Sequence, residues 1–126
     1  MATKYRSKQV VTPDGNVFDS RLEHRRWCEL CLLQRAGVIS DLQRQVTYEL
    51  IPTQREPDII GPRGGVKPGK VLEKAITYTA DFVYTKDGET VVEDTKGFKT
   101  EAYVMRRKLM LYLKGIKIKE VTKNGT

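Results

Sequence analysis

Residues 76–97 read ITYTADFVYTKDGETVVEDTKG, and this stretch decides which fold the chain can adopt. Apolar and polar side chains alternate from Ile76 onward, which predicts a β-strand. Asp87-Gly88 is typical of a tight hairpin turn. A second β-forming run, from Thr90 to Lys96, predicts the returning strand. The stretch therefore predicts a β-hairpin.

The segments on either side of this hairpin predict an α/β fold. Helices are expected over about Ser20–Ala36 and Thr100–Lys114, because each segment has an N-cap residue before it and a glycine after it. Alternation predicts further strands over about Gln43–Ile51 and Ile116–Val121. The order helix, strand, strand, strand, helix, strand predicts a single α/β layer domain over residues 1–126.

One internal segment departs from this regular pattern. Four of the five prolines fall in residues 52–68, with several glycines and basic side chains among them. This composition predicts that residues 52–75 form a mobile basic insertion loop, not a packed element. A strong turn is expected at residues 13–16, and a frayed tail at residues 122–126.

Composition limits the possible partners. The 126 residues include 23 Lys and Arg against 16 Asp and Glu, a net charge of +7, which favours nucleic acid as a partner. No run of about 18 apolar residues is present, so we expect no membrane span. The basic N-terminus, residues 1–6, has no apolar stretch behind it, so we expect no secretory signal and a cytoplasmic protein.

The only cysteines, Cys28 and Cys31, have the spacing of a redox pair or of half a zinc site. A zinc site needs further ligands, and the sole histidine, His24, lies one turn away on the same predicted helix. A redox pair usually opens a helix, whereas this pair lies in mid-helix. The sequence therefore favours buried structural thiols.

Carboxylates are placed unusually on the predicted hairpin. Asp81 interrupts a β-forming run in which aspartate is disfavoured. Asp94 and Lys96 are two residues apart on the returning strand, so their side chains share one face of the sheet. The hairpin can bring two carboxylates and an ammonium group together, and two such acids repel unless a cation neutralises them. The alternative is an exposed charged face around a turn.

Glu23 is a further candidate on the first predicted helix. Its spacing from Trp27 and Leu30 places it on the face that should pack on the sheet, where an unpaired carboxylate is costly. Two structural roles compete with a functional one. Ser20 and Glu23 form a capping-box pattern, and Arg26 is close enough along the helix to pair with Glu23.

Together these motifs resemble the PD-(D/E)XK nuclease superfamily. The resemblance rests on FDSxxE (residues 18–23), YxADFVY (residues 78–84) and VEDxKG (residues 92–97), and it covers about Lys4–Val121 except the insertion. The same motifs resemble a family of small phage and prophage proteins and of Holliday-junction-resolvase-like enzymes. Ala80 replaces the proline of the superfamily name, and Asp94 replaces the more common glutamate.

The resemblance implies a restriction-endonuclease-like core, with a central mixed sheet flanked by helices, and a metal-dependent endodeoxyribonuclease. Glu23, Asp81, Asp94 and the Thr95 carbonyl would hold Mg²⁺ or Mn²⁺, whose preferred ligands are oxygens. Glu23, Asp81, Asp94 and Lys96 would form the catalytic group, with Lys96 positioning the attacking water.

The resemblance also bears on the partners. Expected DNA contacts come from Lys99, Tyr103, Arg106 and Arg107 around the second helix and from Lys67 and Lys70 in the insertion; the alternative for the helix is an ordinary solvated face. The expected substrate is branched, Holliday-junction-like DNA, cut by a homodimer encoded by a phage or prophage in a bacterial host. A nicking or trimming nuclease on linear or single-stranded DNA and a non-catalytic basic DNA-binding protein remain alternatives.

Overall fold

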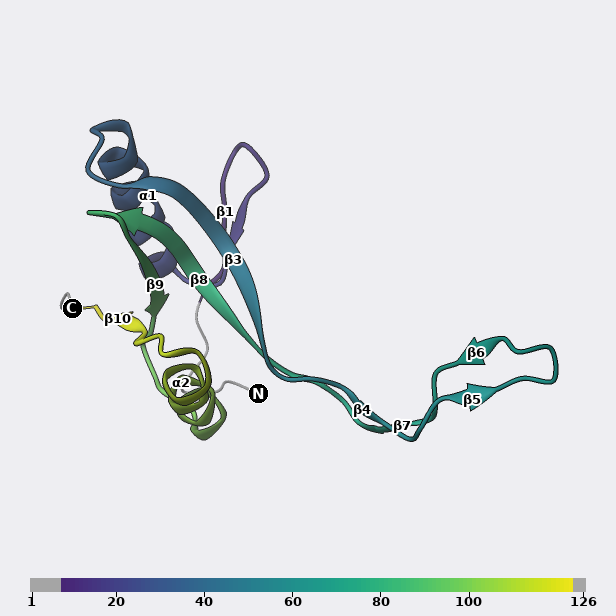
Figure 1. Ribbon diagram of the computed structural model, residues 1–126. Helices are drawn as coiled ribbons and strands as arrows, with labels where there is room; N and C mark the ends of the chain where they lie inside the picture. Colours follow the sequence, from purple (N-terminus) through teal and green to yellow (C-terminus); the bar gives the residue numbers. More distant parts are fainter. Residues whose placement is uncertain (1–7, 124–126) are drawn as a thin grey trace.

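The computed structural model describes residues 8–123, which form a mixed sheet, two helices and a long protruding arm (Figure 1). The strands are β1 (Val10–Val11), β2 (Val17–Phe18), β3 (Ser40–Ile51), β4 (Gln54–Arg55), β5 (Ile59–Ile60), β6 (Val66–Lys67), β7 (Val71–Glu73), β8 (Ile76–Lys86), β9 (Glu89–Thr95) and β10 (Lys119–Val121), and the helices are α1 (Arg21–Arg35) and α2 (Glu101–Lys114). The main sheet has the order β10-β9-β8-β3, with β10 parallel to β9 and the other pairs antiparallel. The predicted α/β class and the mixed sheet are confirmed.

Local sequence signals account for the ends of most of these elements. The Ser20 Oγ accepts a hydrogen bond from the Glu23 N–H (3.1 Å) at the start of α1, and Thr100 caps α2 in the same way. Gly115 ends α2 in the left-handed conformation at φ 66°. Asp87 and Gly88 both have positive φ between β8 and β9, as a type I′ hairpin turn requires.

Two strands differ in length from the sequence prediction. β3 begins at Ser40, earlier than expected, because Ser40 and Gln43 pair with β8 across a bulge. β10 begins at Lys119, later than the expected start at Ile116, because the Ile116 N–H still donates a hydrogen bond to the Met110 carbonyl in the last turns of α2. Around the predicted turn at residues 13–16, β1 and β2 form a small separate hairpin.

The core lies on both faces of the sheet. One cluster joins Leu30 of α1 to Phe82 and Tyr84 of β8. The other cluster joins Tyr103 and Met110 of α2 to the sheet residues Leu50, Tyr78, Ala80, Val83 and Val92. Each helix therefore covers its own face of the sheet.

Along β8, the buried side chains change face at Asp81. Tyr78 and Ala80 belong to the α2 cluster, whereas Phe82, two residues further on, belongs to the α1 cluster. Gln45 lies opposite this point on β3, between the pairs Val46–Ala80 and Arg44–Phe82, and has a φ of 51°. A positive φ is uncommon outside glycine and breaks regular alternation. The strands are therefore distorted where Asp81 lies.

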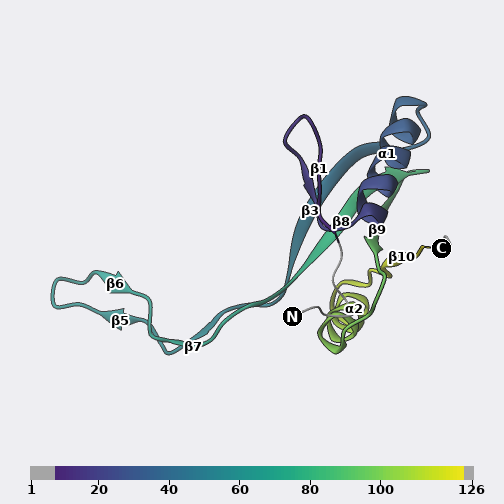
Figure 2. The same cartoon turned by 180° about the vertical axis from the view of Figure 1, so that it is seen from behind.

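Residues 52–75, named the arm here, form paired strands and not the loop that the sequence predicts. β4 pairs with β7, and β5 pairs with β6, as a ribbon that continues β3 and β8 away from the rest of the molecule (Figures 1 and 2). Gly61, Pro62 and Gly64 build the turn at its tip, so residues that suggest a loop in the sequence close a hairpin.

The prediction of buried thiols is wrong. Cys28 is exposed and Cys31 is partly buried, because α1 turns Glu23, Trp27 and Leu30 toward the sheet and leaves Cys28 facing solvent. Both thiols are free.

Across residues 8–123, neither helix has the length and apolar character needed to span a membrane. The first part of the predicted tail, Thr122 and Lys123, follows β10, whereas residues 124–126 and the basic residues 1–6 lie outside the described range.

Candidate active site

Asp81 is held in place by the neighbouring strand. Its Oδ2 accepts hydrogen bonds from the backbone N–H (2.9 Å) and the Oγ1 hydroxyl (2.8 Å) of Thr95, the last residue of β9. Two donors on one oxygen fix the orientation of the carboxylate. Thr95, predicted to contribute a carbonyl to a metal, therefore also acts through its N–H and its side chain.

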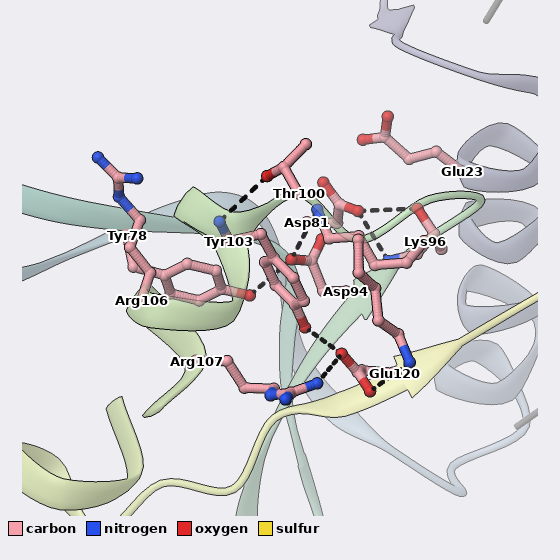
Figure 3. Close-up of polar contacts among 12 residues, drawn as sticks. Glu23, Tyr78, Asp81, Asp94, Lys96, Thr100, Tyr103, Arg106, Arg107 and Glu120 are labelled. Atoms are coloured by element: carbon pink, nitrogen blue, oxygen red, sulfur yellow. Dashed lines mark hydrogen bonds and ion pairs between the residues drawn. The ribbon is translucent and has the colours of Figure 1, made fainter. Parts of the chain in front are cut away.

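Asp94 is deeply buried, with 2% of its surface exposed. Its Oδ2 accepts a hydrogen bond from the Tyr78 hydroxyl (2.9 Å) and lies 3.2 Å from the Lys96 Nζ (Figure 3). Burial and the neighbouring Asp81 carboxyl raise the pKa of Asp94 to about 8, against the opposing effect of Lys96 and Tyr78. Two carboxyls this close favour a shared proton or a bound cation.

The donor set left over in this cluster suits an oxygen-preferring cation. The hydrogen bonds from Tyr78 and Thr95 and the ion pair with Lys96 all reach Oδ2 atoms of Asp81 and Asp94, and the two carboxyls also contact each other. Carboxylate oxygens carry lone pairs that suit a hard cation. No group of three or more His, Cys, Asp or Glu side chains in the described chain is arranged to hold a metal ion. The two aspartates therefore meet as a pair, with Glu23 further away.

Glu23 contributes to the cap of α1 and also lies beside Asp81. It is 2% exposed, and its Oε1 accepts a hydrogen bond from the Asp19 N–H (2.9 Å), one residue before the position that the capping box predicts. Its Oε2 accepts a hydrogen bond from the Gln45 Nε2 (3.0 Å). Burial, followed by the Asp81 charge, raises the pKa of Glu23. In Figure 3 its side chain extends from α1 toward Asp81.

Two residues of β3 complete this side of the site, and neither was assigned to it from the sequence. Gln45 reaches Glu23 because of its positive φ, which no local sequence pattern reveals. The Arg44 Nη2 lies 3.8 Å from the Glu23 Oε2. The Arg44 Cζ lies 3.9 Å from the centre of the Phe18 ring and 5.6 Å from that of the Trp27 ring, within the range of cation–π contacts. Both contacts join β3 to α1, so no pattern within a single segment predicts them.

Glu120 of β10 gathers three residues that were predicted to bind DNA. Its carboxylate lies 3.3 Å from the Lys99 Nζ and 3.2 Å from the Arg107 Nη1, and it accepts a 2.6 Å hydrogen bond from the Tyr103 hydroxyl. Lys96 lies above the Tyr103 ring, with its Nζ 4.3 Å from the ring centre, so this network adjoins Asp94. The Tyr103 ring is buried, at 7% exposure, and packs on Tyr78.

The other predicted DNA contacts are spread over the molecule. Arg106 is partly buried, and its Nε donates to the Thr77 carbonyl (2.8 Å) at the base of the arm. Lys67 and Lys70 are exposed on the arm, away from the carboxylates. The structure thus brings together Asp81, Asp94 and Lys96, places Glu23 beside them, and separates the basic residues into two groups.

Comparisons with known proteins add a family and no activity. No curated protein and no solved structure matches the chain. A family model described as "Protein of unknown function (DUF1064)" matches residues 2–124, so the chain belongs to the DUF1064 family.

Proposed function

We propose that this protein is a metal-dependent endonuclease that hydrolyses phosphodiester bonds in DNA. The observation that carries the proposal is the pair of carboxylates, Asp81 and Asp94, held together at the distorted point of β8 with Lys96 beside them. A protein that only bound DNA would gain nothing from two acids facing a phosphate, because like charges repel. The resemblance to PD-(D/E)XK nucleases supports the same reading.

The residues that would hold Mg²⁺ or Mn²⁺ are Asp81, Asp94, the Thr95 carbonyl and Glu23. When bound, such an ion neutralises the charge that develops on the phosphate and lowers the pKa of a coordinated water. Asp81 is oriented for this role by its two hydrogen bonds from Thr95. The raised pKa of Asp94 indicates a carboxyl whose negative charge lacks a sufficient counter-charge in the protein alone.

Lys96 has the position of a residue that acts on the attacking water and the phosphate. Its ammonium contacts Asp94 and the face of Tyr103, so it is held near the carboxylates and remains partly exposed to solvent. We expect it to donate a hydrogen bond to the incoming water or to a phosphate oxygen, and to stabilise the negative charge that builds up there.

The proposed substrate is branched DNA of the Holliday-junction type, cut by a homodimer. The net charge of +7 supports a polyanionic substrate. Symmetric cutting of a junction needs two active sites in fixed relation, and a two-fold dimer is the simplest assembly that supplies them. Light scattering on the protein with a junction bound tests the dimer; a monomer would favour a nicking or trimming nuclease instead.

The test of the activity is a cleavage assay with Mg²⁺, Mn²⁺ or EDTA on four DNA substrates: a four-way junction, a flap, a linear duplex and a single strand. We expect cleavage that requires the metal and is fastest on the junction. Preference for the linear substrates would support the nicking or trimming alternative. Metal-independent binding of all four substrates with no cleavage would support the non-catalytic alternative.

Replacing Glu23 with glutamine separates its two contacts. The amide oxygen can still accept the Asp19 N–H bond, so we expect the melting temperature to move little, with a cost of a few tenths of a kcal/mol. The negative charge beside Asp81 is lost, so we expect cleavage to fall at least about tenfold. Glu29→Gln, on the exposed side of α1, is the matched control. Unchanged turnover in Glu23→Gln would mean that Glu23 only caps α1 and has no part in cleavage.

A further inference from the structure

We propose that the arm is a DNA-binding β-ribbon that enters the major groove of duplex DNA. This inference rests on the proposed function, because it names how the same substrate is held. It is carried by the shape of the arm, its fixed turn and crossing point, and the charges along its two strands.

The arm has the form of a ribbon long enough to follow DNA. Its outgoing strand runs from residue 52 to the turn at Gly61–Gly64, which at about 3.3 Å per residue is roughly 35 Å if extended. That length is about one turn of B-DNA. A two-stranded β-ribbon fits the major groove, which is about 12 Å wide. Figures 1 and 2 show the arm reaching outward from the sheet on β3 and β8.

The tip of the arm is a defined turn. The Gly64 N–H donates to the Gly61 carbonyl (3.0 Å), and the Gly61 N–H donates to the Gly65 carbonyl (2.8 Å), with Gly64 at φ 82°. Pro62 occupies a position of this turn that its fixed φ favours. The turn therefore holds Arg63 at the far end of the ribbon.

The two strands of the arm cross closely at Gly69. The Glu56 N–H donates to the Lys70 carbonyl (2.8 Å), and the Arg55 Nη1 donates to the Gly69 carbonyl (3.0 Å). A side chain at Gly69 would meet the carbonyl oxygens of Glu56 and Pro57, at 2.1 and 2.5 Å. Backbone atoms cannot give way cheaply at such distances, so this crossing needs glycine.

Charge is distributed unevenly along the ribbon. The outgoing segment, residues 52–62, has one basic and two acidic side chains, whereas the return segment, residues 63–74, has four basic side chains and one acidic. The four basic residues are Arg63, Lys67, Lys70 and Lys74, and within the described chain none of them forms an ion pair. The return strand is therefore the edge that faces phosphates, because cations without protein partners gain most from them.

Apolar side chains on the ribbon fit the same partner. Ile60 pairs with Val66 across the two strands, and Ile60 is 74% exposed. In the groove, such side chains can contact thymine methyl groups. Pairing of two arms through the same edge would instead bring like charges together, which weighs against a second copy of the chain as the partner.

The first test compares two pairs of charge reversals by fluorescence anisotropy in EDTA, on a duplex of about 25 base pairs. For Lys67→Glu with Lys70→Glu we expect an affinity loss of at least about tenfold. The salt slope should fall by about two, since each lost phosphate contact contributes about 0.9. Lys86→Glu with Lys117→Glu is the control, because both residues are exposed outside the arm and the change in net charge is the same. Equal losses in both pairs would overturn the proposal.

The second test uses two glycines of the arm. Gly69→Ala introduces the clash described above, whereas Gly65→Ala meets no atom within 4 Å and has no left-handed φ. We expect Gly69→Ala to weaken duplex binding and to raise hydrogen exchange in the arm, with Gly65→Ala unchanged in both. Normal binding by Gly69→Ala with a disrupted arm would show that the arm does not hold DNA.

Three further readouts separate the alternatives. Competition by methyl green, a major-groove ligand, should release the protein from duplex DNA, and competition only by the minor-groove ligand netropsin would overturn the groove assignment. If Ile60→Asp converts a dimer to a monomer in sedimentation and leaves DNA affinity intact, the arm binds a second copy instead. Binding that depends on the arm, without cleavage, would support this inference and contradict the proposed nuclease activity. Cleavage that does not depend on the arm would support the nuclease activity and contradict this inference.

Discussion

Asp94→Asn should lower the rate of DNA cleavage at least about a hundredfold, because it removes a charge that would hold the metal and stabilise the transition state. The asparagine oxygen can still accept the hydrogen bond from Tyr78, so the fold should persist. DNA binding should persist or tighten, because repulsion of the phosphate decreases. Single-turnover cleavage and anisotropy measure the two effects separately.

The same variant should be more stable than the original protein when metal is absent. Burial and Asp81 raise the pKa of Asp94 to about 8, so above its ordinary pKa this carboxyl costs the folded state free energy. Asparagine carries no such cost, so the melting temperature in EDTA near pH 8 should rise. Asp87→Asn in the hairpin turn is the control, since asparagine also tolerates its positive φ. Cleavage near the original rate in Asp94→Asn would contradict the catalytic assignment.

The largest expected loss of stability comes from the ion pair between α1 and β9. Glu93 has 0% of its surface exposed, and the Arg26 guanidinium holds it through Nε–Oε1 (2.5 Å) and Nη2–Oε2 (3.0 Å) contacts. Arg26→Ala would leave that carboxylate buried with the Tyr84 hydroxyl as its remaining partner. We expect the free energy of unfolding to fall by about 3–5 kcal/mol, measured by urea denaturation.

Neighbouring residues supply the controls for this ion pair. Arg25→Ala should cost less than about 0.5 kcal/mol, because its pair with Glu29 is exposed and 4.0 Å long. Arg26→Met combined with Glu93→Met should recover most of the loss, because removing both charges leaves neither one buried alone. Equal costs for Arg26→Ala and Arg25→Ala would mean that solvent or another side chain takes over from Arg26.

Much of the fold could be predicted because its signals are local. Ser20, Thr100 and Gly115 mark helix ends through their own backbone and side-chain chemistry, and Asp87-Gly88 marks its turn in the same way. The shared face of Asp94 and Lys96 follows from strand periodicity alone, and their 3.2 Å contact confirms it.

The remaining features depend on contacts between distant segments. Regular alternation places Tyr78, Ala80 and Phe82 on one face, and only the pairing with β3 moves Phe82 to the other. The capture of Lys99 and Arg107 by Glu120 needs β10 to lie beside β9, and no residue signals that pairing. In the arm, prolines and glycines predict a loop. In the structure, the same residues close a hairpin.

The position of the only tryptophan gives the site an intrinsic optical reporter. Trp27 stacks on Phe82, with ring centres 6.0 Å apart, and lies 5.6 Å from the Arg44 guanidinium that faces Glu23. Indole emission responds to nearby charge, so movement of Arg44 would change the fluorescence of the unmodified protein. Titration with divalent cation or DNA can therefore be followed without an added label, from a partly buried ring that lies beside Arg44.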